Sequence, residues 1–383
     1  MNIGIEAQRI FREKKHGMDM VALELIRNLQ QIDHENKYFI FVNPDKDDRV
    51  LENTANFRII NLKGGPYPVW EQFALPRAAR ELRCDLLHCT SNTAPLKTSI
   101  PLITTLHDII YMESISLFTK GGSLYQKMGN MYRRWVVPSA VRKSKKVITV
   151  SNFEKDRINN FFGFDDDRLV SVYNGVGSHF KPVTDKAERQ KVSQKYRLPE
   201  KFFFFLGNTD PKKNTPNVLR AFALFNQQSA EKYSLVMLDY EEKALTKLLK
   251  DIGHPGIRQN IHLTGYVVNT ELPAIISQAA LFLYPSLRES FGIPILEGMA
   301  CRVPVITSNT SSMPEVAGDA ALLVNPQNPV EITDAIRKLL SDEDLNRELC
   351  LKGLDRARKF SWRAMAENVL EIYRSVYKNR AAL

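Results

Sequence analysis

Short apolar runs alternate with longer segments of helical periodicity along the chain, and this alternation occurs in two successive series. The order strand, helix, strand predicts a parallel sheet with helices on both faces. The first series places strands at 1–5, 38–42, 57–62, 86–88, 101–106 and 146–150, with helices at 19–31 and 70–82. The second places strands at 202–206, 234–238, 261–264, 281–284 and 303–307, with helices at 215–227, 241–251, 272–279, 330–340 and 364–377.

Two such series predict two doubly wound, Rossmann-like α/β domains that face each other across a cleft. The length of 383 residues agrees, because a single core rarely organises more than about 250–300 residues. Residues 183–198 between the two series are polar and charged. We expect a first domain over 1–180, a second domain over 181–360, and a C-terminal helix in 361–383 that packs back toward the first domain.

The composition is that of a soluble globular protein, with 44% hydrophobic and 25% charged residues. No apolar run approaches the roughly 20 residues of a spanning helix, and the charged N-terminus lacks the apolar region of a secretory signal. These features predict a cytoplasmic location. The four cysteines show neither a CxxC spacing nor a Cys/His pairing, which argues against a disulfide framework and structural zinc: Cys84, Cys89, Cys301 and Cys350.

The formal net charge is +10, and one basic stretch stands out because it contains no acidic residue. Such a stretch with apolar residues among the cations can rest on anionic lipid headgroups or hold a polyphosphate. A solvated helix face is the equal alternative. Nucleic acid is a weaker interpretation, since no zinc-finger spacing or RNA-binding aromatic motif is present. The cations of the stretch are Arg133, Arg134, Arg142, Lys143, Lys145 and Lys146.

The strongest candidate chemistry follows the apolar strand at 281–284. Glu289 and Glu297 bracket a turn that opens a helix near Pro294, because Pro suits a first helical position. Backbone N–H groups at such a helix start attract phosphate, and carboxylates accept hydrogen bonds from hydroxyls. Phosphate together with hydroxyls indicates a sugar nucleotide. Two solvent-facing glutamates at a helix start are the alternative, since acidic residues favour first turns.

A second candidate loop follows the strand at 202–206. It contains Lys212 and Lys213, and an ammonium at the carboxyl edge of the sheet could neutralise a pyrophosphate leaving group. Paired lysines in a loop are more often solvated surface groups, but their position after an all-apolar strand favours a function.

Together these motifs identify the chain as a member of family 4 of the glycosyltransferases, retaining enzymes of the GT-B fold that use sugar nucleotides. The resemblance covers nearly the whole chain. It is carried by the Glu-x7-Glu element from Glu289 to Glu297 and by the segments at 211–214 (PKKN), 304–306 (PVI), 314–318 (PEVAG), 149–153 (TVSNF), 173–176 (YNGV) and 360–362 (FSW).

The resemblance implies catalytic roles for Lys213, Glu289 and His107. Lys213 would bind the donor diphosphate with Lys212 as a helper, Glu289 would hold hydroxyls of the donor sugar, and Glu297 would take the ribose hydroxyls. Further donor contacts would come from the N-terminal glycine loop and from backbone N–H groups before the helix: Gly17, Ser290, Phe291 and Gly292. His107 resembles the acceptor-side histidine of the family, although a lone histidine at a strand end is often structural.

The chain departs from the family pattern at Arg302 and Asp239, where glycine is usual. The Asp165–Asp167 run could be mistaken for a metal-binding Asp-x-Asp motif. A charged surface turn is the expected interpretation, and no metal or other cofactor is assigned. The PKKN form resembles mannosyltransferase branches of the family.

We therefore expect a retaining hexosyltransferase that uses GDP-mannose and acts on a glycan or lipid-linked oligosaccharide in cell-surface polysaccharide assembly. A UDP-sugar donor, a noncatalytic sugar-nucleotide-binding partner and a GT-B epimerase are alternatives. A dinucleotide-dependent oxidoreductase is excluded, because the first strand leads into Glu6-Ala7-Gln8-Arg9 and not into a Gly-x-Gly-x-x-Gly turn.

Overall fold

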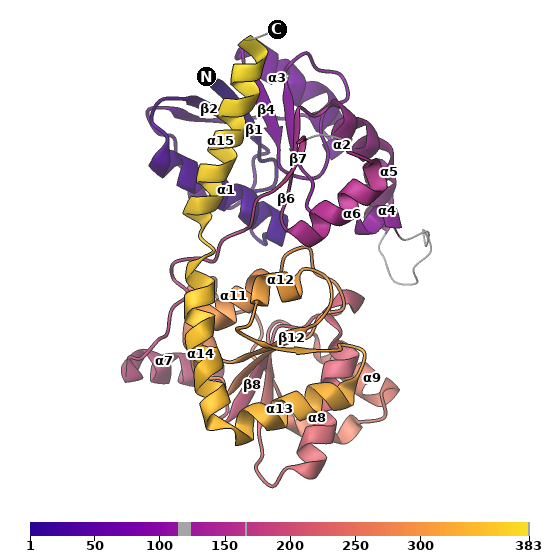
Figure 1. Cartoon of the computed structure of the whole chain (residues 1–383), viewed down its shortest axis with the longest axis vertical. Coiled ribbons are helices and arrows are strands. Elements are labelled where there is room, and N and C mark those ends of the chain that lie inside the picture. Colours follow the sequence, from indigo (N-terminus) through magenta and orange to yellow (C-terminus); the bar gives the residue numbers. More distant parts are fainter. Residues whose placement is uncertain (114–123, 165–166, 382–383) are drawn as a thin grey trace. The chain divides into compact units, whose positions relative to one another are not determined.

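The computed structural model describes residues 1–113, 124–164 and 167–381. The chain divides into two compact units (Figure 1). The first comprises Met1–Asn174 together with the C-terminal segment from Trp362, and the second comprises Gly175–Ser361. Each unit is built on one parallel sheet, as the two series of strands and helices predict.

The first unit contains a seven-stranded sheet in the order β3-β2-β1-β4-β5-β6-β7, and its paired strands run parallel. The central strands are buried on both faces, as a parallel sheet covered by helices requires. The strands are β1 (Asn2–Glu6), β2 (Lys37–Val42), β3 (Phe57–Asn61), β4 (Leu86–Cys89), β5 (Leu102–Thr105), β6 (Lys146–Thr149) and β7 (Leu169–Ser171).

The C-terminal helix α15 belongs to the first unit and packs against α1 and β4, which confirms the expected return of the chain. The Tyr373 hydroxyl on α15 lies 2.7 Å from Nδ1 of His88 on β4. The helices of this unit are α1 (Gly17–Ile32), η1 (Asp48–Val50), α2 (Tyr67–Val69), η2 (Trp70–Ala74), α3 (Leu75–Glu81), α4 (Ile110–Glu113), α5 (Leu124–Lys143), α6 (Asn152–Phe162) and α15 (Trp362–Ala381).

The second unit contains a six-stranded parallel sheet in the order β10-β9-β8-β11-β12-β13. Its central strand β8 is a run of four buried phenylalanines, of which Phe203 stacks on Tyr233 with ring centroids 4.7 Å apart. The strands are β8 (Phe202–Phe205), β9 (Ser234–Met237), β10 (Ile261–Leu263), β11 (Leu281–Tyr284), β12 (Val305–Ser308) and β13 (Leu322–Val324).

Two of the longer helices of the second unit lie where no helix is predicted. The polar stretch 183–198 contains α7, whose first turn is capped by Asp185, and α14 precedes the C-terminal helix. The helices are α7 (Lys186–Tyr196), η3 (Pro211–Lys213), α8 (Thr215–Gln228), α9 (Glu242–Asp251), η4 (Pro255–Asn260), η5 (Asn269–Glu271), α10 (Leu272–Ile276), α11 (Ile293–Ala300), α12 (Met313–Ala317), α13 (Pro329–Ser341) and α14 (Glu343–Arg358).

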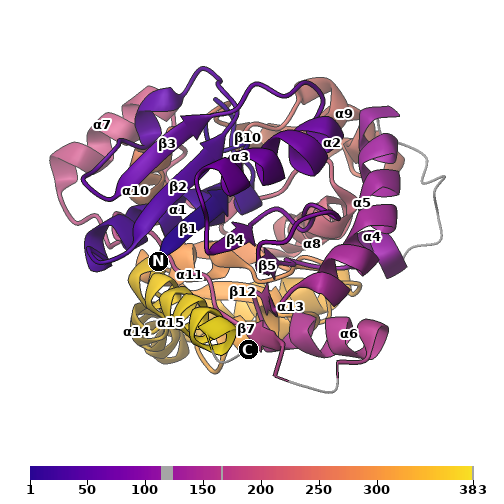
Figure 2. The same cartoon turned by 90° about the horizontal axis from the view of Figure 1, so that it is seen from above.

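The basic stretch falls on α5 and on the start of β6, and only part of it is exposed. Arg142, Lys143 and Lys145 are exposed. Arg133 and Arg134 are half-buried and hold α5 to the neighbouring α4 (Figure 2), since Arg134 Nε donates to the Tyr111 carbonyl at 2.7 Å. The two arginines therefore face the protein, and the membrane contact or solvated face expected of the basic stretch stays a prediction.

All four cysteines are buried and free. Within the described ranges, the search for a helix of sufficient length and apolar character to cross a membrane finds none.

Candidate functional site

The candidate site lies where the strand order of the second sheet reverses. After β8 the chain adds β9 and β10 on one side, and after β10 it returns to add β11 directly beside β8. The loops that follow β8 and β11 therefore leave the same edge of the sheet side by side. Doubly wound folds bind ligands at this reversal, outside the carboxyl ends of the strands.

The loop after β8 forms a tight turn that fixes Lys213. Pro211–Lys213 is a single 3-10 turn, and the Asp210 carboxylate accepts from the Lys212 N–H at 3.1 Å. Asn214 then adopts a left-handed conformation, with φ of 60°. Its buried side-chain amide donates to the Pro285 and Pro326 carbonyls at 2.9 and 2.6 Å. The PKKN segment is thus held to the loop after β11.

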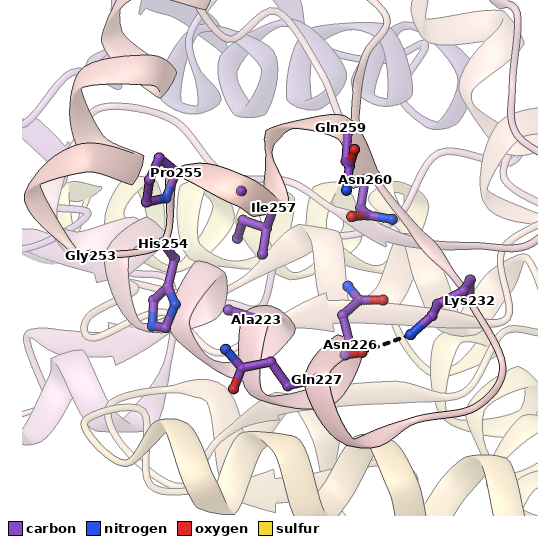
Figure 3. A pocket seen from close by; sticks show the side chains of 11 residues that line it. Ala223, Asn226, Gln227, Lys232, Gly253, His254, Pro255, Ile257, Gln259 and Asn260 are labelled. Carbon is purple, nitrogen blue, oxygen red and sulfur yellow. Dashed lines mark hydrogen bonds between the residues drawn. The ribbon is translucent and has the colours of Figure 1, made fainter.

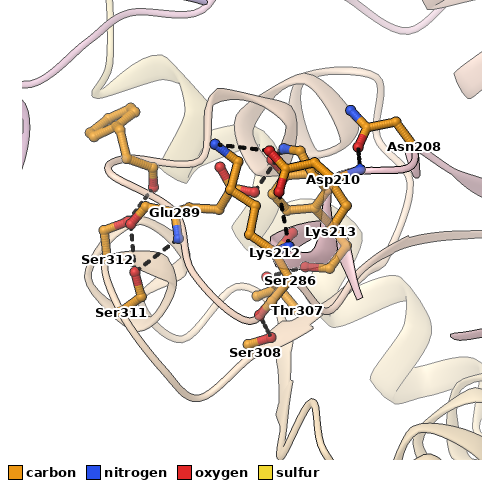
Figure 4. A network of polar contacts seen from close by, with 12 residues as sticks. Asn208, Asp210, Lys212, Lys213, Ser286, Glu289, Thr307, Ser308, Ser311 and Ser312 are labelled. Atoms are coloured by element: carbon orange, nitrogen blue, oxygen red, sulfur yellow. Dashed lines mark hydrogen bonds and ion pairs between the residues drawn. The ribbon is translucent and has the colours of Figure 1, made fainter. Parts of the chain in front are cut away.

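Lys213 and Glu289 form the centre of the site (Figure 4). The Lys213 ammonium lies 2.7 Å from Glu289 Oε1 and donates to the Tyr284 hydroxyl at 2.7 Å. It also lies 4.8 Å from the centroid of the Tyr284 ring, a cation–π distance. The two charged side chains are only 15% and 11% exposed. A charge pair so far removed from water requires such partners.

Three groups from neighbouring loops hold the backbone around Glu289. The Ser311 hydroxyl lies 3.0 Å from the Glu289 nitrogen, and the Ser312 hydroxyl donates to the Glu289 and Phe291 carbonyls at 2.9 and 2.8 Å. The Leu287 N–H donates to the Lys212 carbonyl at 2.7 Å. These bonds fix the carboxylate loop independently of any ligand.

Gly292 connects this loop to α11 in a conformation that glycine allows and other residues rarely adopt. Its φ is 102°, and a Cβ built there would lie 3.1 Å from Ile295 Cδ1. The helix that follows directs its N-terminal end toward the loop, where its dipole favours an anion.

Glu297 lies on α11 and faces the same charges. Removal of water around its carboxyl raises its pKa from the ordinary 4.5 to about 7, while the nearby Lys213 ammonium opposes the shift. The Tyr284 pKa is also raised well above its usual value, by burial and by the Glu289 and Glu297 charges. Two carboxyls, one ammonium and one phenol thus share a single electrostatic environment.

The comparisons with known proteins agree with this geometry. Residues 16–179 match the family described as Glycosyltransferase Family 4, and residues 186–354 match Glycosyl transferases group 1. O-antigen chain mannosyltransferase B of Escherichia coli is 32% identical over 277 residues, which cover 71% of this chain and 70% of that protein. The chain belongs to the family 4 glycosyltransferases.

This glycosyltransferase also resembles a second mannosyltransferase in sequence and two solved glycosyltransferase structures in fold. O-antigen chain mannosyltransferase RfbU of Salmonella typhimurium is 28% identical, with 66% of this chain and 64% of that protein covered. The structure of Anabaena HepE with UDP-glucose has a TM-score of 0.76 at 17% identity, and covers 98% of this chain and 100% of its own. WaaG, a glycosyltransferase involved in lipopolysaccharide biosynthesis, has a TM-score of 0.72 at 14% identity, with 97% and 99% covered. These likenesses confirm the GT-B fold.

The two lysines of the PKKN segment differ in exposure and in partner. Lys213 joins Glu289, whereas the Lys212 side chain is 42% exposed and lies 3.7 Å from the Asp210 carboxylate. Phe291 is 3% exposed and its ring centroid lies 5.9 Å from that of Phe360. The expected donor contacts of the Ser290, Phe291 and Gly292 N–H groups stay predictions.

His107 and Gly17 belong to the first unit. His107 follows β5, is 5% exposed, and its Nε2 lies 3.0 Å from the Thr90 carbonyl. Burial lowers its pKa, so its surroundings favour the neutral imidazole. Gly17 begins α1 in an open position, with no atom within 4 Å of a built Cβ. The roles expected of these two residues stay predictions.

The two departures from the family pattern both occupy left-handed conformations. Arg302 has φ of 60° and Asp239 has φ of 40°, which explains why glycine suits these positions. Arg302 follows the C-terminal end of α11 and is exposed, so it stands at the helix end opposite to Gly292. Asp239 follows β9 and is also exposed.

Tyr284, Ser311 and Ser312 are parts of the site that the sequence analysis does not identify. Tyr284 ends β11. A tyrosine at the carboxyl end of a buried strand is the feature of the sequence that indicates a place in the site. The serines follow β12, and no motif marks them as supports of the Glu289 loop.

Another hollow of the second unit lies at the opposite edge of the sheet, before the starts of β9 and β10 (Figure 3). Its one lysine, Lys232, donates to the Asn226 and Ser229 carbonyls, at 3.0 Å each. The residues that line the hollow include no carboxylate. It therefore lacks the paired charges of the site around Lys213.

The described residues contain no cluster of three or more histidine, cysteine or acidic side chains suited to a metal ion. Asp165 and Asp166 of the Asp165–Asp167 run lie outside the described residues.

Proposed function

We propose that this glycosyltransferase is a retaining hexosyltransferase that transfers mannose from GDP-mannose to a glycan or lipid-linked oligosaccharide. The product would be a cell-surface polysaccharide. The relatives named O-antigen mannosyltransferases support the sugar and the pathway class. The Lys213–Glu289 pair at the strand reversal is the observation that carries the proposal.

The pair suggests how the donor is bound. A nucleoside diphosphate brings two negatively charged phosphates, and the Lys213 ammonium can leave Glu289 to neutralise them. Glu289 then accepts hydrogen bonds from hydroxyls of the sugar, and Glu297 accepts from the ribose. Charge-assisted bonds of this kind are shorter and stronger than neutral ones.

The same arrangement can assist the departure of the nucleoside diphosphate. As the bond between the sugar and the diphosphate breaks, negative charge grows on the leaving phosphate, and Lys213 stabilises it without movement of solvent. The acceptor hydroxyl attacks from the face that the diphosphate leaves, so the anomeric configuration is retained. His107 would serve on the acceptor side. We assign no metal to the reaction, because the ammonium and the start of α11 supply the positive charge.

A matched pair of variants tests the proposal. Lys213→Ala should lower mannose transfer by about a hundredfold to a thousandfold, the loss typical of one transition-state donor. Lys212→Ala should lose far less, because its exposed side chain pairs with the Asp210 carboxylate of its own loop. Transfer is measured with GDP-mannose and an acceptor glycan, and circular dichroism checks the fold. Full transfer by Lys213→Ala would overturn the proposal.

A thermal-shift comparison of nucleotides identifies the nucleobase of the donor, because a ligand that binds only the folded state raises the melting temperature. We expect GDP to raise it more than UDP or ADP, in the presence and absence of EDTA. A larger shift with UDP would favour a UDP-sugar donor, the ligand in the HepE structure. Tight GDP binding without transfer or donor hydrolysis would favour a noncatalytic partner of a glycan assembly complex.

A further inference from the structure

The hollow before the starts of β9 and β10 has the size of a binding site and a polar lining. Its volume is about 570 Å³, within the roughly 300–1,000 Å³ of small-molecule sites. Figure 3 shows the end of α8 on one side of it and the segment 253–260 on the other. The polar side chains that line it are Asn226, Gln227, Lys232, His254, Gln259 and Asn260.

The segment 253–260 forms a fixed wall of this hollow. The Arg258 guanidinium donates to both carboxylate oxygens of Glu242 on α9, at 2.7 and 2.5 Å. It also donates to the Ile261 carbonyl at the start of β10, at 2.7 Å. Ile257 is 9% exposed and belongs to the core of the second unit. The backbone that carries the polar side chains is therefore held in place without a ligand, which lowers the cost of binding one.

Several polar groups of the lining leave their hydrogen-bonding capacity unused. Among the residues that the structure describes, four of these side chains have no hydrogen-bond partner: Gln227, His254, Gln259 and Asn260. Asn226 adds a buried oxygen, Oδ1, that accepts no hydrogen bond there either. Amide and imidazole groups both donate and accept, as the hydroxyl groups of a ligand do.

The charges of the lining disfavour an ionic ligand. The residues that line the hollow include no carboxylate, and the Lys232 ammonium already donates to two backbone carbonyls. Ala223, Pro255 and Ile257 supply apolar surface between the amides, against which the C–H face of a sugar ring can lie. Neutral hydroxyls combined with small apolar faces are the chemistry of an oligosaccharide.

We propose that this hollow binds a neutral segment of a glycan chain. It lies at the edge of the sheet opposite to Lys213, since Lys232 precedes β9 and Asn260 precedes β10. A glycan in the hollow therefore does not compete with the donor nucleotide. The choice of mannose as its sugar rests on the proposed function, whereas the glycan class rests on the lining.

Hydrogen exchange of the full chain with α-mannotetraose tests the proposal. We expect slower exchange over 253–260 and at the end of α8, because a bound ligand suppresses local opening. The effect should not depend on salt, since the ligand carries no charge. Gln227→Ala combined with Asn260→Ala should weaken the apparent affinity about tenfold, because two hydrogen-bonding side chains are lost.

Gln228→Ala is the matched control. Gln228 is the next residue of α8, is also exposed, and does not line the hollow, so this variant should bind α-mannotetraose as the wild type does. In the same experiment GDP should slow exchange over 208–214 and 287–293 in all three proteins. That effect shows that the variants are folded and tests the donor site separately. Its absence alongside protection of 253–260 would contradict the donor site and still support the hollow.

Three results would overturn the proposal. The first is no protection of 253–260 by α-mannotetraose or by maltotetraose, a second neutral oligosaccharide. The second is equal protection in the wild type and the double variant. The third is protection of 253–260 by GDP or inorganic phosphate, which would make the hollow an anion site. Protection by maltotetraose alone would support a glycan site and contradict mannose as its sugar.

Discussion

Tyr284 illustrates how one side chain sets the position of the Lys213 ammonium. Its hydroxyl accepts from Lys213 while its ring lies beside the same ammonium. The buried ring cannot move aside, since Tyr284 is 1% exposed. Lys213 therefore meets a fixed partner on one side and the Glu289 carboxylate on the other.

Tyr284→Phe should keep the ring and remove the hydroxyl. Loss of one hydrogen bond is worth about 0.5–1.5 kcal/mol, so we expect kcat for sugar transfer to fall about three- to tenfold with little change in melting temperature. Tyr233→Phe makes the same chemical change at the opposite edge of the sheet and should leave transfer unchanged. Steady-state kinetics on both variants decides, and an unaltered kcat for Tyr284→Phe would argue against a positioning role.

Glu297 predicts a pH dependence of nucleotide binding. Its folded-state pKa of about 7 lies above the ordinary 4.5, so it is protonated in the free protein below about pH 7 and ionised above. The ionised form is the better acceptor for ribose hydroxyls. We therefore expect GDP affinity to rise between about pH 6 and 8.

Titration calorimetry on wild type and Glu297→Gln separates this effect from the titration of GDP itself, which both proteins share. The rise should be steeper for the wild type. Parallel pH profiles would show that Glu297 does not control the dependence.

The sequence identifies the charged residues of the site better than their supports. Lys213, Glu289 and Glu297 follow apolar strands, and the carboxyl ends of parallel strands meet at one edge. The 3-10 turn at Pro211–Lys213 gives Lys212 and Lys213 different surroundings, and the two serines support the Glu289 loop. Both features depend on how the loops fold. No periodicity in the sequence records such loop contacts.

At the scale of the elements, prediction succeeds where apolar periodicity is strong. The strands around Phe203 and Leu283 are all-apolar runs, and they are found. Helix α7 buries only Val192 and Tyr196, and α14 packs through small side chains such as Gly353 and Ala357. Gly353 lies against Met299 of α11, with a built Cβ 3.2 Å from Met299 Cγ. Small residues allow close packing but give little hydrophobic signal.

The end of α11 offers a stability prediction. Arg302 adopts φ of 60°, which costs a residue with a Cβ about 1–2 kcal/mol, partly offset because glycine has more conformational freedom to lose. Arg302→Gly should stabilise the second unit by about 0.5–1 kcal/mol. Arg302→Ala retains the Cβ and should not. Thermal unfolding compares the two, and equal effects would mean that the side chain, not the backbone, sets the stability.

At the scale of the whole molecule, the first unit is built from two separate segments of the chain, and the second unit lies between them in sequence. The chain leaves the first unit after Asn174, builds the second, and returns at Trp362. The two series of strands in the sequence reveal two sheets, because each sheet is continuous in the chain. The return of α15 depends on its packing against α1 and β4, which lie far away in sequence.

The contact of α15 with β4 predicts a local loss of stability. His88 is fully buried, with Nδ1 2.7 Å from the Tyr373 hydroxyl and Nε2 2.7 Å from that of Thr105. Tyr373→Phe leaves the ring nitrogen without its partner inside the core, which costs about 1–3 kcal/mol. Hydrogen exchange should rise in β4, α1 and α15, and not in β8 or β11.

Acid should weaken the same contact. Burial lowers the His88 pKa from 6.5 to about 3, so below about pH 6.5 the unfolded first unit binds a proton that the folded unit does not. The free energy of unfolding of the first unit therefore falls as pH decreases from about 6.5 toward 3. His88→Gln should show a shallower fall, because glutamine does not titrate. Exchange rates in α15 that rise equally in both proteins would exclude His88 as the cause. A rise specific to the wild type would show that one buried imidazole couples the C-terminal helix to pH, while the site around Lys213 stays folded.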